Sequence, residues 1–228
     1  MRAILILSGG LDSTVSAHLA SRSGVICFSL TFDYGQRSAL REKEAVAKTA
    51  KNLGLDHKVI ELPWLKEITN NALVGAVREL PLLRPSELDD REKTDASARA
   101  VWVPNRNGVF LNIAAAHAEA LDCDTVVTGF NAEEAATFPD NSVSFVEAAD
   151  RFFSFATLKK VRVKSFTQEM TKVEIVRAGG ELGVNFSDLW NCYEGGEKQC
   201  GRCESCLRSI RAYREVGIWE RVKANYAD

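Results

Sequence analysis

The stretch LILSGGLDSTVSAHLA, which spans Leu5–Ala20, decides the fold class expected for this chain. A short apolar run stops at Ser8, Gly9 and Gly10, and helical spacing of apolar residues begins near Ser13. Glycines let the backbone approach an anion closely, and the start of a helix offers free N–H groups and a partial positive charge. The stretch therefore predicts a strand, a phosphate-binding turn and a helix, although an ordinary tight turn with a polar cap is the alternative.

Further short apolar runs follow the opening stretch, and helical patterns separate them. These runs are Val25–Phe32, His57–Leu62, Thr125–Phe130 and Val161–Phe166. Continuously apolar strands that alternate with helices are typical of a parallel sheet covered on both faces. We therefore predict an α/β fold with a parallel sheet, made of a nucleotide-binding domain over residues 1–189 and a small C-terminal unit over residues 190–228.

Two other stretches predict helices, and one predicts a loop. Residues 45–53 show helical spacing that ends at Gly54, and residues 107–122 are apolar on nearly every face, as in a buried helix capped by Asn107. Residues 84–99 carry dense charge without a repeated apolar face. We interpret them as a solvated loop, and a mobile lid over a substrate is the alternative.

The composition excludes several classes of partner. The 228 residues are 46% hydrophobic and 26% charged, which describes a globular chain with one core or one core and an appendage. The net charge of −2 and the lack of a basic stripe predict no direct contact with nucleic acid. The N-terminal apolar run Ala3–Leu7 is too short to cross a membrane, so we expect a cytoplasmic protein without membrane contact.

Four of the six cysteines fall in the segment CYEGGEKQCGRCESC. Intervals of two residues let neighbouring sulfurs converge on one tetrahedral ion, and cysteines in a reducing compartment favour a metal over disulfides. The segment predicts a closed, structural Zn²⁺ site, with an iron–sulfur cluster or a redox pair as alternatives. The predicted ligands are Cys192, Cys200, Cys203 and Cys206.

The motif SGGLDST, residues Ser8–Thr14, contains neither the Gly-Lys-Ser/Thr of nucleoside triphosphatases nor a G-x-G-x-x-G pattern. It resembles the pyrophosphate loop of the ATP pyrophosphatases, which cleave ATP between the α- and β-phosphates and form adenylated intermediates. The resemblance implies a Rossmann-like fold of the adenine nucleotide alpha hydrolase type, with ATP and Mg²⁺ as cofactors. It places ATP at Ser8, Gly9, Gly10, Leu11, Asp12, Ser13, Thr14, Val15, Ser16, Ala17 and His18.

Attack at the α-phosphorus of ATP develops charge that a metal ion and a separate cation must neutralise. Asp12 is a candidate organiser of the loop or of the metal, and Ser13 offers a hydroxyl donor. Lys172 opens the helical segment TKVEIVRAGGELG and is the candidate cation, although a solvated lysine at a helix start is an equal alternative. We predict that these three residues are catalytic.

Three further motifs resemble one branch of this superfamily, the 7-cyano-7-deazaguanine synthases. They are FDYGQR, VPNRN and GFNAEEAATFPDNS, and together with the loop and the cysteines they span nearly the whole chain. The resemblance implies an ATP-dependent ligase and homodimer that converts 7-carboxy-7-deazaguanine and ammonia to the nitrile, for queuosine or archaeosine. The candidate substrate-binding residues are Tyr34, Gln36, Arg37, Asn105, Arg106, Asn131, Glu134, Phe138 and Asp140.

One segment departs from the family pattern and leaves other functions open. Ala136–Ser142 keeps Pro139 and Asp140 but lacks the Cys and Arg of many members, which fits either a subgroup with the same activity or a different acceptor. The alternatives are a pyrophosphate-loop enzyme of tRNA thiolation and a non-catalytic zinc module that senses ATP. Thiolation would require a basic RNA-binding surface, and a sensor would not require polar motifs at several strand ends.

Overall fold

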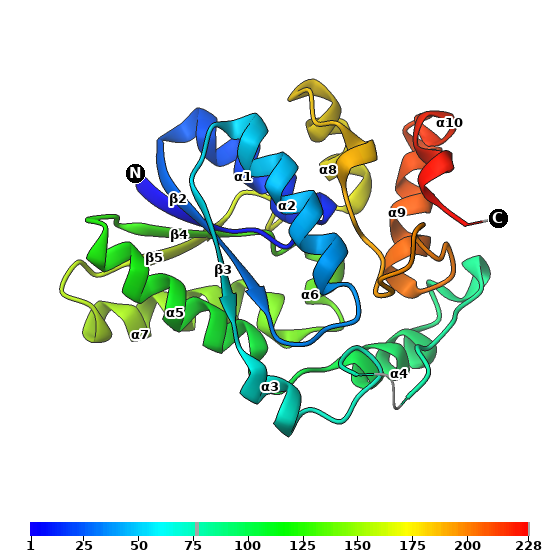
Figure 1. The fold of residues 1–228 in the computed structure, drawn as a ribbon, viewed down its shortest axis with the longest axis horizontal. Coiled ribbons are helices and arrows are strands. Elements are labelled where there is room, and N and C mark those ends of the chain that lie inside the picture. Colours follow the sequence, from blue (N-terminus) through cyan, green and yellow to red (C-terminus); the bar gives the residue numbers. More distant parts are fainter. Residues whose placement is uncertain (76–77, 228) are drawn as a thin grey trace.

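A five-stranded parallel sheet forms the centre of the computed structural model, which describes residues 1–75 and 78–227 (Figure 1). The strand order is β3-β2-β1-β4-β5, so the chain reverses direction across the sheet between β1 and β4. This arrangement confirms the predicted α/β fold, with strand ends that differ from the expected ones by a few residues. The strands are β1 (Arg2–Ile6), β2 (Val25–Asp33), β3 (His57–Glu61), β4 (Thr125–Thr128) and β5 (Arg162–Ser165).

Helices cover both faces of the sheet because successive residues of each strand point to opposite sides. Leu5 packs in one apolar cluster with α1 (Leu11–Ser23) and α2 (Ala39–Leu53), whereas Ile4 packs in another with α5 (Arg106–Ala120). In Figure 1, α1 and α2 lie on one side of the sheet, and α5 and α7 (Val143–Ala156) lie on the other. The remaining α-helices are α3 (Pro63–Ile68), α4 (Arg91–Val101), α6 (Ala132–Ala135), α8 (Lys172–Glu181), α9 (Glu204–Glu215) and α10 (Trp219–Val222).

The prediction of a solvated loop over residues 84–99 is wrong, because most of that stretch belongs to α4. The helix is capped by Asp90, whose carboxylate accepts hydrogen bonds from two backbone N–H groups of the first turn. Its buried face consists of small residues at helical spacing, namely Thr94, Ser97, Ala98 and Val101. The apolar pattern failed to reveal this face because two of its four residues carry hydroxyl groups.

The helix expected over residues 107–122 is also corrected in two respects. It begins at Arg106, and the residue before it, Asn105, adopts a left-handed conformation with φ of 52°, so Asn107 lies inside the helix and is not its cap. The helix is buried along one stripe only, and Leu121 beyond its end is exposed. It covers the sheet with this stripe, and Asn112, Ala116 and Ala120 face solvent.

The segment after Leu189 packs onto the rest of the fold through one shared apolar cluster. In it, Leu11 and Val15 of α1 and Ile175 of α8 meet the cysteine segment and Tyr213 of α9. The division at residue 189 stays a prediction, and the final residue of the second unit, Asp228, lies outside the described residues. Among the residues that the structure describes, no helix is both long enough and apolar enough to cross a membrane.

Candidate active site

The loop between β1 and α1 lies at the carboxyl edge of the sheet, beside the point where the strand order reverses. Open α/β sheets bind ligands at this place. Gly9 has φ of +77°, and a Cβ atom there would lie 2.8 Å from the carbonyl oxygen of Glu42, so a larger residue is excluded. The hydroxyl oxygens of Ser8 and Ser13 lie 3.0 Å apart and close the turn. The loop therefore presents a rigid concave backbone at the start of α1.

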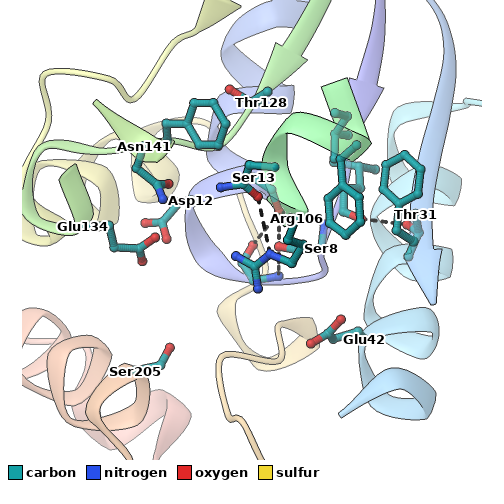
Figure 2. A pocket seen from close by; sticks show the side chains of 18 of the residues that line it. Ser8, Asp12, Ser13, Thr31, Glu42, Arg106, Thr128, Glu134, Asn141 and Ser205 are labelled. Carbon is teal, nitrogen blue, oxygen red and sulfur yellow. Dashed lines mark hydrogen bonds between the residues drawn. The ribbon is translucent and has the colours of Figure 1, made fainter. Parts of the chain in front are cut away.

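A cavity opens over this loop (Figure 2). Figure 2 shows Asp12, Arg106 and Glu134 around it, and Ser205 of α9 facing them. A smaller pocket lies beside the first and shares five lining residues with it, namely Arg106, Glu134, Asn141, Tyr193 and Ser205. The two spaces thus meet at one guanidinium and one carboxylate. Other residues of the smaller pocket are Trp102, Phe138 and Asp140.

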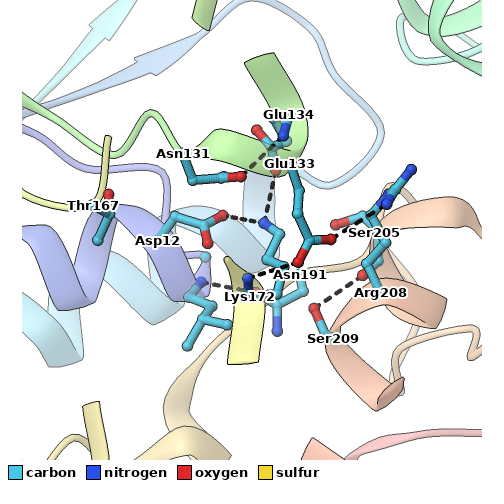
Figure 3. Close-up of polar contacts among 12 residues, drawn as sticks. Asp12, Asn131, Glu133, Glu134, Thr167, Lys172, Asn191, Ser205, Arg208 and Ser209 are labelled. Carbon is cyan, nitrogen blue, oxygen red and sulfur yellow. Dashed lines mark hydrogen bonds and ion pairs between the residues drawn. The ribbon is translucent and has the colours of Figure 1, made fainter. Parts of the chain in front are cut away.

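A buried charge cluster forms one wall of the main cavity. The ammonium group of Lys172 donates hydrogen bonds to Asp12 and to Oε1 of Glu134, the latter at 2.7 Å (Figure 3). Lys172 is only 4% exposed, so the alternative of a solvated lysine at a helix start is wrong. The second carboxylate oxygen of Asp12, Oδ1, is buried and has no hydrogen-bond partner among the described residues. It is a free acceptor beside the phosphate-type loop.

The pKa values of this cluster follow from two carboxylates that share one ammonium group. Burial raises the pKa of Asp12 to about 6, against the attraction of Lys172 and with the repulsion of Glu134. Burial also acts to raise the pKa of Glu134, but the charge and hydrogen bond of Lys172 outweigh it and hold that pKa below its ordinary value. The two carboxylates together raise the pKa of Lys172, which therefore stays cationic.

Arg106 forms the boundary between the two pockets. Its guanidinium donates to the hydroxyl of Tyr34 at 3.1 Å and lies 5.7 Å from the centre of that ring. The carboxylates of Asp140 and Glu42 are close enough to help raise the pKa of Arg106. Burial raises the pKa of both carboxyl groups. Arg106 thus provides a fixed positive charge that faces both spaces.

The structure brings some of the predicted site residues to the cavities and leaves others outside them. Ser8, Gly10, Asp12, Ser13 and Tyr34 line the main cavity, and Arg106 and Glu134 line both. Phe138 and Asp140 line the smaller pocket. The second half of the predicted ATP segment turns away with α1, and Val15 and Ala17 are buried in the core. Ser16 donates to the carbonyl of Thr128, and Thr14 and His18 line a separate polar pocket.

Other predicted substrate residues make structural contacts near the cavity. The side chain of Gln36 accepts from the backbone N–H of Tyr34 at 2.9 Å and so holds the turn after β2. Arg37 donates to the carbonyl of Gly75 at 3.0 Å. Asn105 precedes α5, and Asn131 caps α6 by accepting from the backbone N–H of Glu134 at 3.0 Å. These residues fix the backbone on which Tyr34, Arg106 and Glu134 are mounted.

Sequence reasoning missed the residues that the cysteine segment brings to the cavity. Tyr193 and Ser205 line both pockets, and the side chain of Asn191 accepts from the backbone N–H of Leu11 at 2.8 Å. The backbone N–H of Trp190 donates to the carbonyl of Gly9 at 2.9 Å. Their position beside the cysteines was the available signal, but nothing in the spacing shows that this segment returns to the sheet edge.

The four cysteines predicted as metal ligands come together. Their sulfur atoms all lie within 4.8 Å of one another, and backbone N–H groups donate to the sulfurs of Cys192 and Cys200 at 3.2–3.4 Å. Hydrogen bonds from the neighbouring thiols hold the pKa of Cys200 below its ordinary value. Four convergent thiolates with such donors fit the tetrahedral geometry of a structural metal site, for which zinc is a suitable ion.

Comparison with known proteins places the chain in a family. The family model of "Queuosine biosynthesis protein QueC" matches residues 2–217. The chain is 58% identical to the 7-cyano-7-deazaguanine synthase of Pelotomaculum thermopropionicum, over 96% of this chain and 99% of the relative. It is 49% identical to that of Bdellovibrio bacteriovorus, over 95% and 94%, and 46% identical to that of Methanosarcina mazei, over 96% of each chain.

A solved structure shares the fold at low sequence identity. A crystal structure of a 4-thiouridine synthetase–RNA complex with bound ATP superposes with a TM-score of 0.50 and 19% identity, over 96% of this chain and 52% of the other. The family match confirms the resemblance drawn from the loop and the motifs at the strand ends. The chain therefore belongs to the QueC family of queuosine biosynthesis proteins, to which the 7-cyano-7-deazaguanine synthases belong.

Proposed function

We propose that this protein is a cytoplasmic, ATP-dependent carbon–nitrogen ligase. It converts 7-carboxy-7-deazaguanine and ammonia to 7-cyano-7-deazaguanine through an adenylated intermediate, for queuosine or archaeosine biosynthesis. The observation that carries the proposal is the placement of buried Lys172 against Asp12 and Glu134, beside a phosphate-type loop and an adjoining second pocket. Such a site can hold a nucleotide and a second reactant next to each other.

The reaction uses ATP to turn a poor electrophile into a good one. A carboxylate oxygen of the substrate attacks the α-phosphorus, pyrophosphate leaves, and ammonia then displaces AMP to give the amide. Adenylation of the amide oxygen by a second ATP, followed by loss of a proton and AMP, gives the nitrile. Ser8, Gly9 and Gly10 hold the leaving pyrophosphate, while Ser13 donates to it and Lys172 stabilises charge at the α-phosphorus.

The smaller pocket suits the bicyclic ring of the substrate. The rings of Trp102 and Phe138 are nearly parallel, at an interplanar angle of 10°, with centroids 6.3 Å apart. We place the deazaguanine ring against these faces, with Asp140 as an acceptor for its N–H groups. Its carboxylate then points to Arg106, at the boundary with the ATP cavity.

We propose two metal ions, Mg²⁺ in the main cavity and a structural Zn²⁺ at the cysteines. The unpartnered Oδ1 of Asp12, with Glu134 nearby, fits a hard cation, so these carboxylates would hold Mg²⁺. The ion would neutralise phosphate charge during adenylation. The four cysteines would hold Zn²⁺ in a closed set of thiolates, where it stabilises the fold of the segment.

An apolar stripe on α7 supports a homodimer. Phe152 and Phe155 are 53% and 84% exposed and lie one turn apart on α7, and Phe152 lines an apolar groove between α5 and α7 with Leu111 and Phe145. A contiguous exposed apolar face of this kind marks an interaction surface. Light scattering should report a dimer for the native protein and a monomer for Phe152→Ser/Phe155→Ser. Leu40→Ser, which replaces an exposed leucine of α2, is the control and should stay dimeric. A monomeric native protein would contradict this proposal.

Turnover tests the proposed reaction directly. Purified protein with ATP, Mg²⁺, ammonium and 7-carboxy-7-deazaguanine should yield the amide and the nitrile by mass spectrometry, with one pyrophosphate for each adenylation. Lys172→Met should lower turnover by about 100- to 1,000-fold, because it removes the cation that stabilises charge at the α-phosphorus. Absence of both products would refute the proposal, and binding of ATP without turnover would favour an ATP sensor instead.

A further inference from the structure

We infer that Glu133 and Arg208 are positioning residues for Lys172, an inference that rests on the proposed role of Lys172 in adenylation. Neither residue touches the main cavity, and both lie in a chain of contacts that links α9 to the start of α8 (Figure 3). These contacts hold the start of α8, where Lys172 lies.

Glu133 connects three elements through one carboxylate. It precedes Glu134 in α6, and its Oε1 accepts from the backbone N–H of Lys172 at 2.8 Å. That N–H belongs to the first residue of α8 and has no partner within its own helix. The carboxylate accepts its hydrogen bond, and its negative charge interacts favourably with the positive end of the helix dipole. Oε2 of the same carboxylate accepts from Arg208 of α9 at 3.3 Å. Glu133 therefore fixes the backbone from which the Lys172 side chain extends.

Arg208 anchors this carboxylate to the cysteine segment. Its guanidinium binds Glu204 through two N–H groups, at 2.8 and 3.0 Å, and reaches Glu133 with a third. Glu204 is the first residue of α9 and directly follows Cys203. Cys206 lies two residues after Glu204 in the same helix. The largely buried side chains of Glu204, Arg208 and Glu133 thus connect the cysteine segment to the start of α8.

Loss of Arg208 would leave the Glu133 carboxylate with only a longer contact, 3.6 Å, to the guanidinium of Arg211, whose side chain is 40% exposed. The Glu133 carboxylate, which is 19% exposed, is then free to turn toward water, and its hold on the Lys172 backbone weakens. A misplacement of about 1 Å in a catalytic group can cost about 100-fold in rate. The ATP-binding loop lies on another element, so substrate binding should change much less than the chemical step.

The test compares variants of this bridge with a matched control on the same two helices. Arg208→Gln should lower kcat by about 10- to 100-fold while KM for ATP changes less than about threefold. Glu133→Gln, which keeps an oxygen for the Lys172 N–H, should lower kcat less than Glu133→Ala does. Arg177→Gln removes the exposed pair Arg177–Glu215, which also joins α8 to α9 but at 58% and 57% exposure, and should leave kcat unchanged.

A double variant separates positioning from a general loss of structure. In a Lys172→Ala background, Arg208→Gln should cause no further loss of kcat, because the side chain that it positions is gone. Additive losses would overturn the inference, as would native kcat in both Arg208→Gln and Glu133→Gln. If Arg208→Gln loses its metal, Glu133→Gln decides, since it leaves the Arg208–Glu204 pair in place. Full activity of Lys172→Ala would instead refute the proposed role of Lys172 and the inference with it.

Discussion

Asp12 is the proposed Mg²⁺ ligand and also has a raised pKa. Two carboxylates, Asp12 and Glu134, are held against the single ammonium group of Lys172 in a buried place, so ionisation of both is unfavourable. Burial raises the pKa of Asp12 to about 6, from an ordinary value of 3.8. Because this pKa is higher in the folded than in the unfolded state, protonation of Asp12 stabilises the fold. That stabilisation is fully present below pH 3.8 and is lost as the pH rises through about 6.

The same titration predicts the pH dependence of activity. In the proposed mechanism only ionised Asp12 holds Mg²⁺, so kcat/KM should rise with pH through an apparent pKa of about 6 that belongs to the coupled pair. Glu134→Gln removes the neighbouring negative charge and should move this limb to lower pH, whatever its effect on the absolute rate. Rates of pyrophosphate release between about pH 5 and 8 measure the limb. An unmoved limb in Glu134→Gln would show that another group is titrating.

At the scale of elements, close packing between the end of β4 and the start of α1 constrains the loop between β1 and α1. Gly129 follows β4 directly, and a Cβ atom there would lie 2.4 Å from the backbone nitrogen of Ser13. All of its nearest contacts are backbone atoms, which cannot rotate away. The end of one strand thus fixes the first turn of the helix that carries the loop.

Gly129→Ala should therefore destabilise the fold by about 1–3 kcal/mol and weaken ATP binding, because α1 must shift. Gly180→Ala is the matched control. Its Cβ would meet nothing within 4 Å, and alanine in a helix interior should add about 0.5–1 kcal/mol of stability. Urea unfolding and titration calorimetry with ATP measure the two effects. Equal ATP affinity in both variants would show that the strand does not constrain the loop.

The elements also show what could be predicted from the sequence. The strand–loop–helix unit and the cysteine cluster were predictable because each depends on neighbouring residues. Helix α4 was not, because its buried face is built from Thr94, Ser97, Ala98 and Val101 and lacks a strong apolar pattern. Tyr193 and Ser205 were missed for a different reason, since only the folded path of the chain brings them to the sheet edge.

At the scale of the whole molecule, the cysteine segment and the proposed ATP site share one apolar cluster. Leu11 of the loop region packs in it with Cys192 and Cys203. Cys203→Ser, or removal of the metal by a chelator, should therefore lower the thermal midpoint and weaken ATP binding by about 5- to 150-fold, the usual range for coupled sites. Cys27→Ala, at a cysteine outside the cluster, should retain metal and ATP affinity. Native ATP affinity in the metal-free protein would contradict this coupling.

The hydrogen bond from Leu11 to Asn191 joins residues 180 positions apart in the chain. A ribosome adds roughly 5–20 residues each second, so the loop waits on the order of ten seconds or longer after its own synthesis for this partner. Until Asn191 has been synthesised, the nascent chain carries the proposed ATP-binding loop without its hydrogen bond to Asn191. The loop is therefore the first motif to be synthesised and one of the last to gain all of its contacts.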